Sequence, residues 1–296
     1  MNYQDFLADI RTQLSAQIEP DAILRIQTMP RNNGTFYDGL VILRPGRNIS
    51  PAIYLTPYYH RYLAGVSMED IYADILSAYR RHLPEEDFDT SMFTNFEKVH
   101  SRIIMRLINY ARNEELLQDV PHFLFQDLAV VFYCLLHASD ENQASILIHN
   151  EHLALWGIDG EQIYALAKKN TPRLMPFHIR SMQELLHNFH SSEFSAHYDC
   201  DPPMLVITNR FRTNGASVLL YEGLLASFAR HLHANLLILP SSVHEIILLP
   251  VEDDSALAAA SRIVQEVNET QLTDEEVLSD HAYYYDRLTK RLTCPS

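Results

Sequence analysis

The chain has 296 residues, of which 47% are hydrophobic and 21% charged, and its formal net charge is −15. This composition excludes a disordered chain, because disorder combines low hydrophobicity with high charge. The acidic excess runs through the whole length, which disfavours a nucleic-acid or anionic-membrane binder, since such binding needs a basic surface. No apolar run reaches the roughly 20 residues that span a bilayer.

The cysteines and the first residues predict the compartment. Cys134, Cys200 and Cys294 are odd in number and widely spaced, and no C-x-x-C motif is present. This pattern indicates a reduced intracellular protein without disulfides or a cysteine-built zinc site. The opening segment is amphipathic and lacks the basic flank and apolar run of a signal peptide. We therefore expect a cytoplasmic protein without a membrane segment.

Residues 1–84 predict an N-terminal α+β lobe. Helical spacing of apolar residues comes first, followed by two alternating segments around a Pro-Arg-Asn-Asn-Gly turn, which predicts a β-hairpin. A short strand follows, and Ser67 stands where it would cap a second helix. The expected elements lie at residues 3–18, 22–28 with 36–43, 52–55 and 68–82.

Residues 85–95 form an acidic, loop-like stretch that is the candidate linker between two lobes. Residues 96–296 would then form a C-terminal α+β lobe, and one continuous domain is the alternative. Residues 96–117 fit either a strand followed by a helix or one long helix. We expect strands at 127–138, within 144–156, and at 204–208, 236–239 and 245–249. We expect helices at 160–169 (stopped by Pro172), 177–189, 216–233, 251–267 and 275–292.

Together these patterns predict an α+β fold: a mixed, largely antiparallel sheet covered by helices. The clearest stretch is Met204 to Pro250, where a strand, a polar turn, a helix and two more strands follow one another. If these strands pair, two polar segments meet at one sheet end. The residues that we expect to recognise a ligand or partner are Asn209, Arg210, Arg212, Asn214 and Ser241.

Ser242, His244 and Glu245 are weak catalytic candidates in the second of these segments. A hydroxyl, an imidazole and a carboxylate are the minimum set for acid–base or nucleophilic chemistry. However, neighbouring residues of a strand face opposite ways, so His244 and Glu245 share a pocket only if the turn twists them. Local capping of the turn by the two serines is the structural alternative.

No metal or cofactor is expected. The segment from His244 begins like a zinc-protease H-E-x-x-H helix, but Leu248 occupies the position of the second histidine. His149 and His152 flank Glu151, yet metal sites need three or four converging ligands. Nucleotide-binding glycine motifs are absent from the sequence.

Several phrases in the chain resemble an uncharacterised bacterial domain-of-unknown-function family, whose members often occur among accessory genes of mobile elements. The resemblance covers most of the chain. It implies an intracellular α+β protein with no established activity, cofactor or catalytic residue, and a role in host interaction or interference with host defence. The phrases are KVHSRIIMRLINYARNEELLQDVPH, FQDLAVVFY, HNEHLALWGI, LAKKNTPRLMP, LVITNRFRTNGASVLLY and ILPSSVHEIILLP.

Three functions remain open from the sequence. The leading hypothesis is a soluble accessory protein, without enzymatic activity, that binds another macromolecule, and we expect that partner to be a protein. The second is a hydrolase or transferase that uses Ser242, His244, Glu245 and an arginine of the 209–214 turn. The third is an acidic nucleic-acid mimic that inhibits a host nuclease, which requires carboxylates in a row at phosphate spacing.

Overall fold

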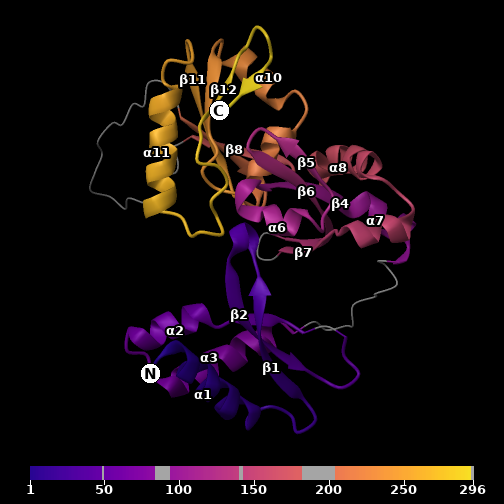
Figure 1. Ribbon diagram of the computed structural model, residues 1–296, viewed down its shortest axis with the longest axis vertical. Helices are drawn as coiled ribbons and strands as arrows, with labels where there is room; N and C mark the ends of the chain where they lie inside the picture. The colour runs from indigo at the N-terminus through magenta and orange to yellow at the C-terminus, as the bar shows by residue number, and fades with distance from the viewer. Residues whose placement is uncertain (49, 84–93, 140–142, 182–203, 295–296) are drawn as a thin grey trace. The chain divides into compact units, whose positions relative to one another are not determined.

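The computed structural model describes residues 1–48, 50–83, 94–139, 143–181 and 204–294. In these residues helices combine with antiparallel strands in three sheets, which confirms the α+β fold (Figure 1). The chain divides into two compact units, Met1–Thr90 and Ser91–Ser296. Most of the expected linker at 85–95 lies outside the described residues. That the two units are independent domains stays a prediction.

Unit 1 is a three-stranded antiparallel sheet, in the order β1-β2-β3, with helices on one face. The expected hairpin is present, and its register pairs Ile23 with Leu43 and Pro30 with Phe36. The side chain of Ser67 accepts a hydrogen bond from the Asp70 N–H, so it caps α3 as expected. The bounds are α1 Tyr3–Ser15, β1 Ile23–Pro30, β2 Phe36–Leu43, β3 Ala52–Tyr54, α2 Thr56–Leu63 and α3 Met68–Arg81.

The core of unit 1 follows from the spacing of its apolar residues. Phe6, Ile10 and Leu14 of α1 are fully buried and pack in one cluster with Leu40 and Ile75. Helix α2 was not expected from the sequence, although its Pro57 stands in the first turn, where proline is tolerated. Its tyrosines complete the packing over α1.

Unit 2 contains two antiparallel sheets within its described residues. The first has β4, β6 and β5 in that order, with β7 paired to the other end of β6. The second runs β13-β12-β10-β11-β9-β8. The strand bounds are β4 Ile103–Asn109, β5 His122–Phe125, β6 Leu128–Ala138, β7 Gln143–Leu147, β8 Phe177–Ser181, β9 Leu205–Asn209, β10 Asn235–Leu239, β11 Ile246–Val251, β12 Tyr283–Tyr285 and β13 Leu292–Thr293.

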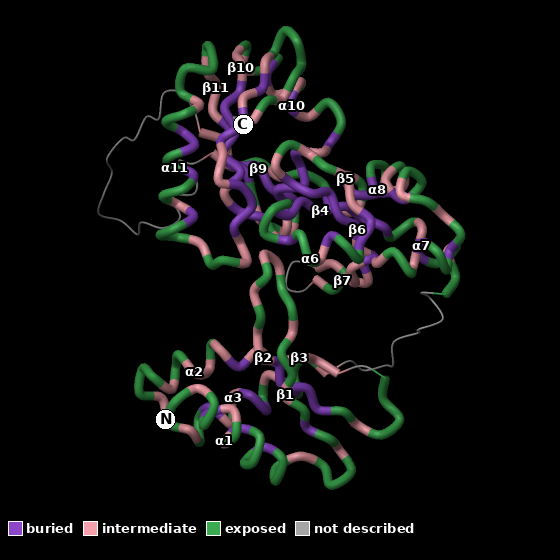
Figure 2. Tube along the Cα trace, viewed as in Figure 1, coloured by how far each residue is buried: buried purple, intermediate pink, exposed green. Residues whose placement is uncertain are grey.

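Both sheets contribute to one apolar core. Phe132 of β6, Ile207 of β9, Ile238 of β10 and Tyr283 of β12 belong to the same buried cluster. Figure 2 shows the buried residues gathered along the central strands. The main helices are α5 Phe96–Val99, α6 Glu114–Leu117, α7 Asn150–Trp156, α8 Gly160–Leu174, α10 Leu224–His231 and α11 Leu257–Thr270; short 3-10 turns are η2 His100–Arg102, η3 Ala111–Asn113 and η4 Gly215–Leu220.

Helix α8 closes the outer edge of β4. The Asn170 side-chain amide donates to the Ile103 carbonyl at 3.1 Å, and the Met105 N–H donates to the Thr171 hydroxyl at 3.0 Å. Two polar side chains thus take the place of a neighbouring strand, because exposed strand edges otherwise leave backbone groups unpaired. The helix also continues through Pro172 to Leu174, so the expected stop at this proline is wrong.

Tertiary contacts overturn four further local predictions. Residues 177–181 form β8 rather than a helix, and the rest of the expected 177–189 helix lies outside the described residues. The helix expected at 216–233 divides at Gly223, whose φ of 74° is left-handed. The helix at 275–292 is absent, because Tyr283–Tyr285 pairs with β10 instead. Residues 144–156 hold β7 and then helix α7.

Two histidines cap the start of α7. The His149 N–H donates to Nδ1 of His152 at 2.9 Å, and the His152 ring stacks on Trp156. Nδ1 of His152 accepts this bond only while it carries no proton. Burial lowers the pKa of His152, and the charge of Glu151 only partly opposes this effect. The cap therefore depends on a neutral imidazole.

This cap predicts a pH dependence of stability. A folded-state pKa below the unfolded value means that the unfolded chain binds more protons, so stability is complete above about pH 6.5 and falls as the pH drops below it. We expect His152→Gln, which keeps a side-chain acceptor, to reduce the loss of unfolding free energy between pH 7 and 5 by a measurable amount, on the order of 0.5 kcal/mol. Urea denaturation at both pH values measures this difference, and an unchanged pH dependence in the variant would contradict it.

Candidate functional site

The turn after β9 is organised by the side chain of Asn209. Its Oδ1 accepts from the Phe211 N–H at 2.9 Å, and its Nδ2 donates to the Thr213 carbonyl at 2.7 Å. Asn209 is only 2% exposed. Arg212 and Asn214 have left-handed backbone angles, with φ of 55° and 51°. Asn209 therefore shapes the turn from inside, and its expected role in recognition stays a prediction.

Gly215 joins this turn to the second polar segment. Its N–H donates to the His244 carbonyl at 3.0 Å, and the Thr208 hydroxyl donates to the same oxygen at 2.7 Å. A Cβ at Gly215 would lie 2.1 Å from the Thr208 hydroxyl and 2.5 Å from the His244 carbonyl oxygen. The structure thus brings segments 209–214 and 241–244 together, and only glycine allows this approach.

His244 lies between the turn after β9 and Glu276, a residue that the sequence did not predict to be near it. Its Nδ1 accepts from the Asn214 N–H at 3.2 Å, so the neutral ring carries its proton on Nε2. Nε2 lies 3.7 Å from Oε1 of Glu276. Glu245, the expected carboxylate, is exposed instead, in the segment that leads into β11. The partner of His244 therefore comes from a segment thirty-odd residues later in the sequence.

Glu276 is held by its own turn. Its Oε2 accepts from the Thr273 N–H at 3.0 Å and from the Thr273 hydroxyl at 2.7 Å. Burial alone raises the pKa of Glu276, but the two hydrogen bonds from Thr273 are the main opposing cause, and the net pKa is lowered. Thr273-x-x-Glu276 has the spacing of a helix capping box, but in the structure it closes a turn and not a helix.

In the second segment Ser242 accepts a backbone hydrogen bond through its side chain, and Ser241 accepts one through its own carbonyl. The Ser242 hydroxyl oxygen accepts from the His244 N–H at 3.1 Å, and the carbonyl of Ser241 accepts from the Leu278 N–H at 2.7 Å. With Nδ1 of His244 accepting and Nε2–H facing Glu276, neither ring nitrogen is available to take a proton from Ser242. The hydrogen bonds thus describe a structured turn, and hydrolase or transferase activity stays a prediction.

Arg210 and Arg212 are the exposed members of the expected recognition set. The Arg210 N–H donates to the Pro176 carbonyl at 2.8 Å, which ties the turn to the start of β8. The guanidinium of Arg210 lies 5.9 Å from the centre of the Phe211 ring. The two arginines are therefore presented on an ordered backbone.

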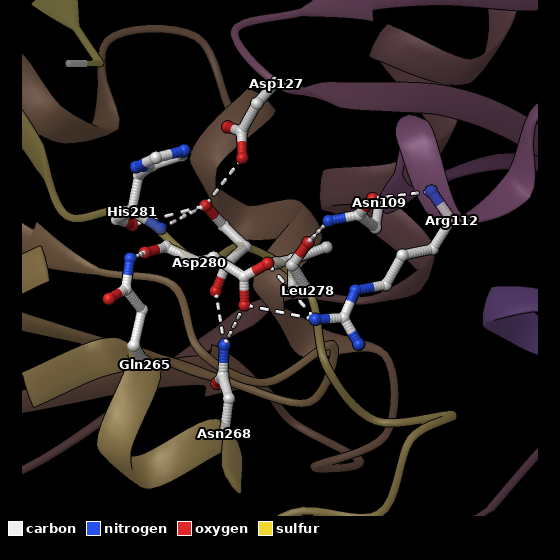
Figure 3. Close-up of polar contacts among 9 residues, drawn as sticks. Asn109, Arg112, Asp127, Gln265, Asn268, Leu278, Asp280 and His281 are labelled. Carbon is white, nitrogen blue, oxygen red and sulfur yellow. Dashed lines mark hydrogen bonds and ion pairs between the residues drawn. The ribbon is translucent and has the colours of Figure 1, made fainter. Parts of the chain in front are cut away.

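A second polar cluster surrounds residues 277–285, which we call the C-terminal strap. The Asn109 side chain, at the end of β4, donates to the Leu278 carbonyl at 2.9 Å, while its Oδ1 accepts from the Arg112 N–H (Figure 3). Arg112 forms an ion pair with Asp280 at 3.1 Å. Asn268 of α11 donates to the same carboxylate at 2.8 Å. The strap is thus held by a strand of the first sheet and by α11.

The carboxylate of Asp127 fixes the other side of the strap. It accepts from the Ser279 hydroxyl at 2.7 Å and from the Tyr283 hydroxyl. Burial and the nearby Asp127 raise the pKa of Tyr283, and the same two causes raise the pKa of Cys294 to about 12. A thiol with this pKa is not a nucleophile near neutral pH. The cluster is therefore suited to holding the chain together, not to covalent catalysis.

Within the described part of the chain, no group of three or more His, Cys, Asp or Glu side chains is arranged to hold a metal ion. His149 bonds to Asp119 at 2.8 Å through Nδ1 and belongs to the α7 cap with His152. Among the same residues, no helix combines the length and apolarity needed to cross a bilayer.

Comparison with known proteins identifies one family. The model of DUF5688, a family of unknown function, matches residues 3–287, which is nearly the whole chain. Neither the curated proteins nor the solved structures contain a match to the chain.

The contact at Gly215 yields a direct test of how the turn is built. We expect Gly215→Ala to lower the free energy of unfolding by about 2 kcal/mol or more, because its Cβ would overlap backbone and side-chain atoms. The control is Gly160→Ala, whose Cβ would meet only Phe123, at an ordinary 3.5 Å. Chemical denaturation of both variants measures the effect, and equal stability would contradict the packing described.

Proposed function

For this chain, which belongs to the family DUF5688, we propose a function in binding another protein through the edge of its six-stranded sheet. The observation that carries the proposal is an exposed apolar edge strand beside two exposed arginines. We further propose that the protein is a bacterial, cytoplasmic accessory protein of mobile elements, and that its partner belongs to the host or to host defence.

Strand β8 supplies the apolar part of this surface. It pairs with β9 on one side, and no strand pairs with its other side among the described residues. Phe177 and Ile179, two positions apart on one face, are 47% and 37% exposed. An open strand edge binds an extended segment through its backbone, while alternate side chains select the partner. Natural proteins rarely leave such an edge apolar without a use.

The arginine turn lies next to this edge. In the β8–β9 register Phe177 pairs with Asn209, and the next residue, Arg210, bonds to Pro176 through its N–H. Aromatic residues and arginines dominate the energy of protein interfaces. The rigid turn lowers the entropy lost on binding. We therefore expect a partner that offers an extended segment with acidic side chains.

The remaining polar residues support recognition over catalysis. The side chains of Asn209 and Ser242 bond to backbone groups of the two segments. Arg210 and Arg212 are the exposed charges of the turn. The acidic surface of the rest of the chain keeps nucleic acid away from this small basic region.

Affinity capture from a bacterial lysate, followed by quantitative mass spectrometry, tests this proposal. We expect Phe177→Ser with Ile179→Thr to reduce the captured partner at least tenfold, because a loss of about 1.4 kcal/mol is a factor of ten in affinity. Arg210→Glu should reduce it independently. The control is Leu155→Ser on α7, away from the β8 edge. It removes an apolar side chain that is 58% exposed.

A protein retained by the wild type and by Leu155→Ser but lost from both edge variants supports the proposal. The proposal is contradicted if the wild type and all three variants retain the same proteins. It is also contradicted if the wild type retains no protein above background. Circular dichroism of each variant excludes unfolding as the cause of lost binding.

A further inference from the structure

We infer that Arg106 forms a binding site for an anionic group, a carboxylate or a phosphate. The site lies on the face of the β7-β6-β4 sheet that points away from the main core. Arg106 lies in the middle of β4, where every residue is buried, and it is only 9% exposed. An arginine side chain keeps its charge at this position. Nothing in the proposed partner-binding edge accounts for this cation.

Strand alternation places Arg106 on the face opposite the main core. Ile103, Met105 and Leu107 of β4 join the core shared by both sheets. Ile108 and Ile104, which flank Arg106 on its own face, belong to two smaller apolar clusters. The guanidinium therefore lies between two apolar patches, in surroundings that strengthen electrostatic interactions.

The described residues neutralise this charge incompletely. Nη2 donates to the Gln143 side-chain carbonyl at 3.1 Å and to the Ser145 hydroxyl at 2.9 Å, both of them neutral acceptors. The guanidinium also stacks over the Tyr133 ring at 4.1 Å. The buried Nε has no hydrogen-bond partner among the described residues. No carboxylate there forms an ion pair with Arg106, and burial lowers its pKa.

A buried cation without a counter-ion is costly, and an anion relieves that cost. The guanidinium offers further N–H donors, and carboxylate and phosphate are the groups that arginine binds best. Tyr133, Gln143 and Ser145 are only half-buried, which makes the β7 side the approach by which an anion would reach the guanidinium. Gln143 and Ser145 would hold the guanidinium in place.

Arginine Nε–H NMR tests the site in the full-length protein. Sodium phosphate and sodium acetate are titrated separately, with sodium chloride at matched ionic strength as the reference. The Arg106 resonance is assigned by its loss in Arg106→Lys. We expect a saturable shift of this resonance with phosphate, acetate or both, and the stronger response identifies the phosphate or carboxylate class. If neither anion shifts it beyond the chloride reference, the inference is wrong.

Thermal denaturation provides a second measurement. The anion should raise the melting temperature of the wild type and of the control Arg102→Met, an exposed arginine nearby, but not of Arg106→Met. Without added anion, Arg106→Met should be at least as stable as the wild type, because it removes a buried charge whose hydrogen-bond acceptors among the described residues are neutral. An Arg106→Met variant that is stabilised by the anion as much as the wild type would overturn the assignment.

Discussion

The carboxylate of Asp127 is the contact on which the arrangement of unit 2 depends. It lies just before β6, in the first sheet, and it accepts hydrogen bonds from Ser279 and Tyr283 of the C-terminal strap. Tyr283 is fully buried and belongs to β12 of the second sheet. Hydrogen bonds to a charged, partly buried group contribute more than neutral ones. One carboxylate thus ties two sheets and the strap into a single core.

The candidate surfaces follow from this connection. The strap pairs with residues 240–243 through backbone hydrogen bonds, and it brings Glu276 to His244. Those residues in turn hold Gly215 and the arginine turn, which fixes the start of β8. The edge strand and its arginines are therefore positioned by a network that includes the strap, which lies more than sixty residues later in the sequence. Arg106 lies outside this network, and the groups that hold its guanidinium among the described residues, Gln143, Ser145 and the Tyr133 ring, carry no opposite charge.

Sequence patterns correctly predicted those helices and turns that are determined by residues close together in the sequence. Helix α1, the β1–β2 hairpin and the Ser67 cap are encoded by spacing and turn residues within a few positions. Residues 283–285 show the opposite case, because their helical spacing was outweighed by pairing with β10. His244 and Glu245 lie just before β11, and no local signal could identify Glu276 as the neighbour of His244. The same holds for Asn170 and Thr171, whose partners are on β4.

Hydrogen exchange measured by mass spectrometry tests most directly whether the strap makes the two sheets one cooperative unit. Tyr283→Phe removes the hydroxyl that donates to Asp127. The control, Tyr284→Phe, removes the neighbouring tyrosine hydroxyl, which does not bond to Asp127. We expect Tyr283→Phe to cost about 1–3 kcal/mol and to accelerate exchange in β6 and β10 together, with little change in Tyr284→Phe. Faster exchange confined to β12 and β13, with β6 unchanged, would contradict the account.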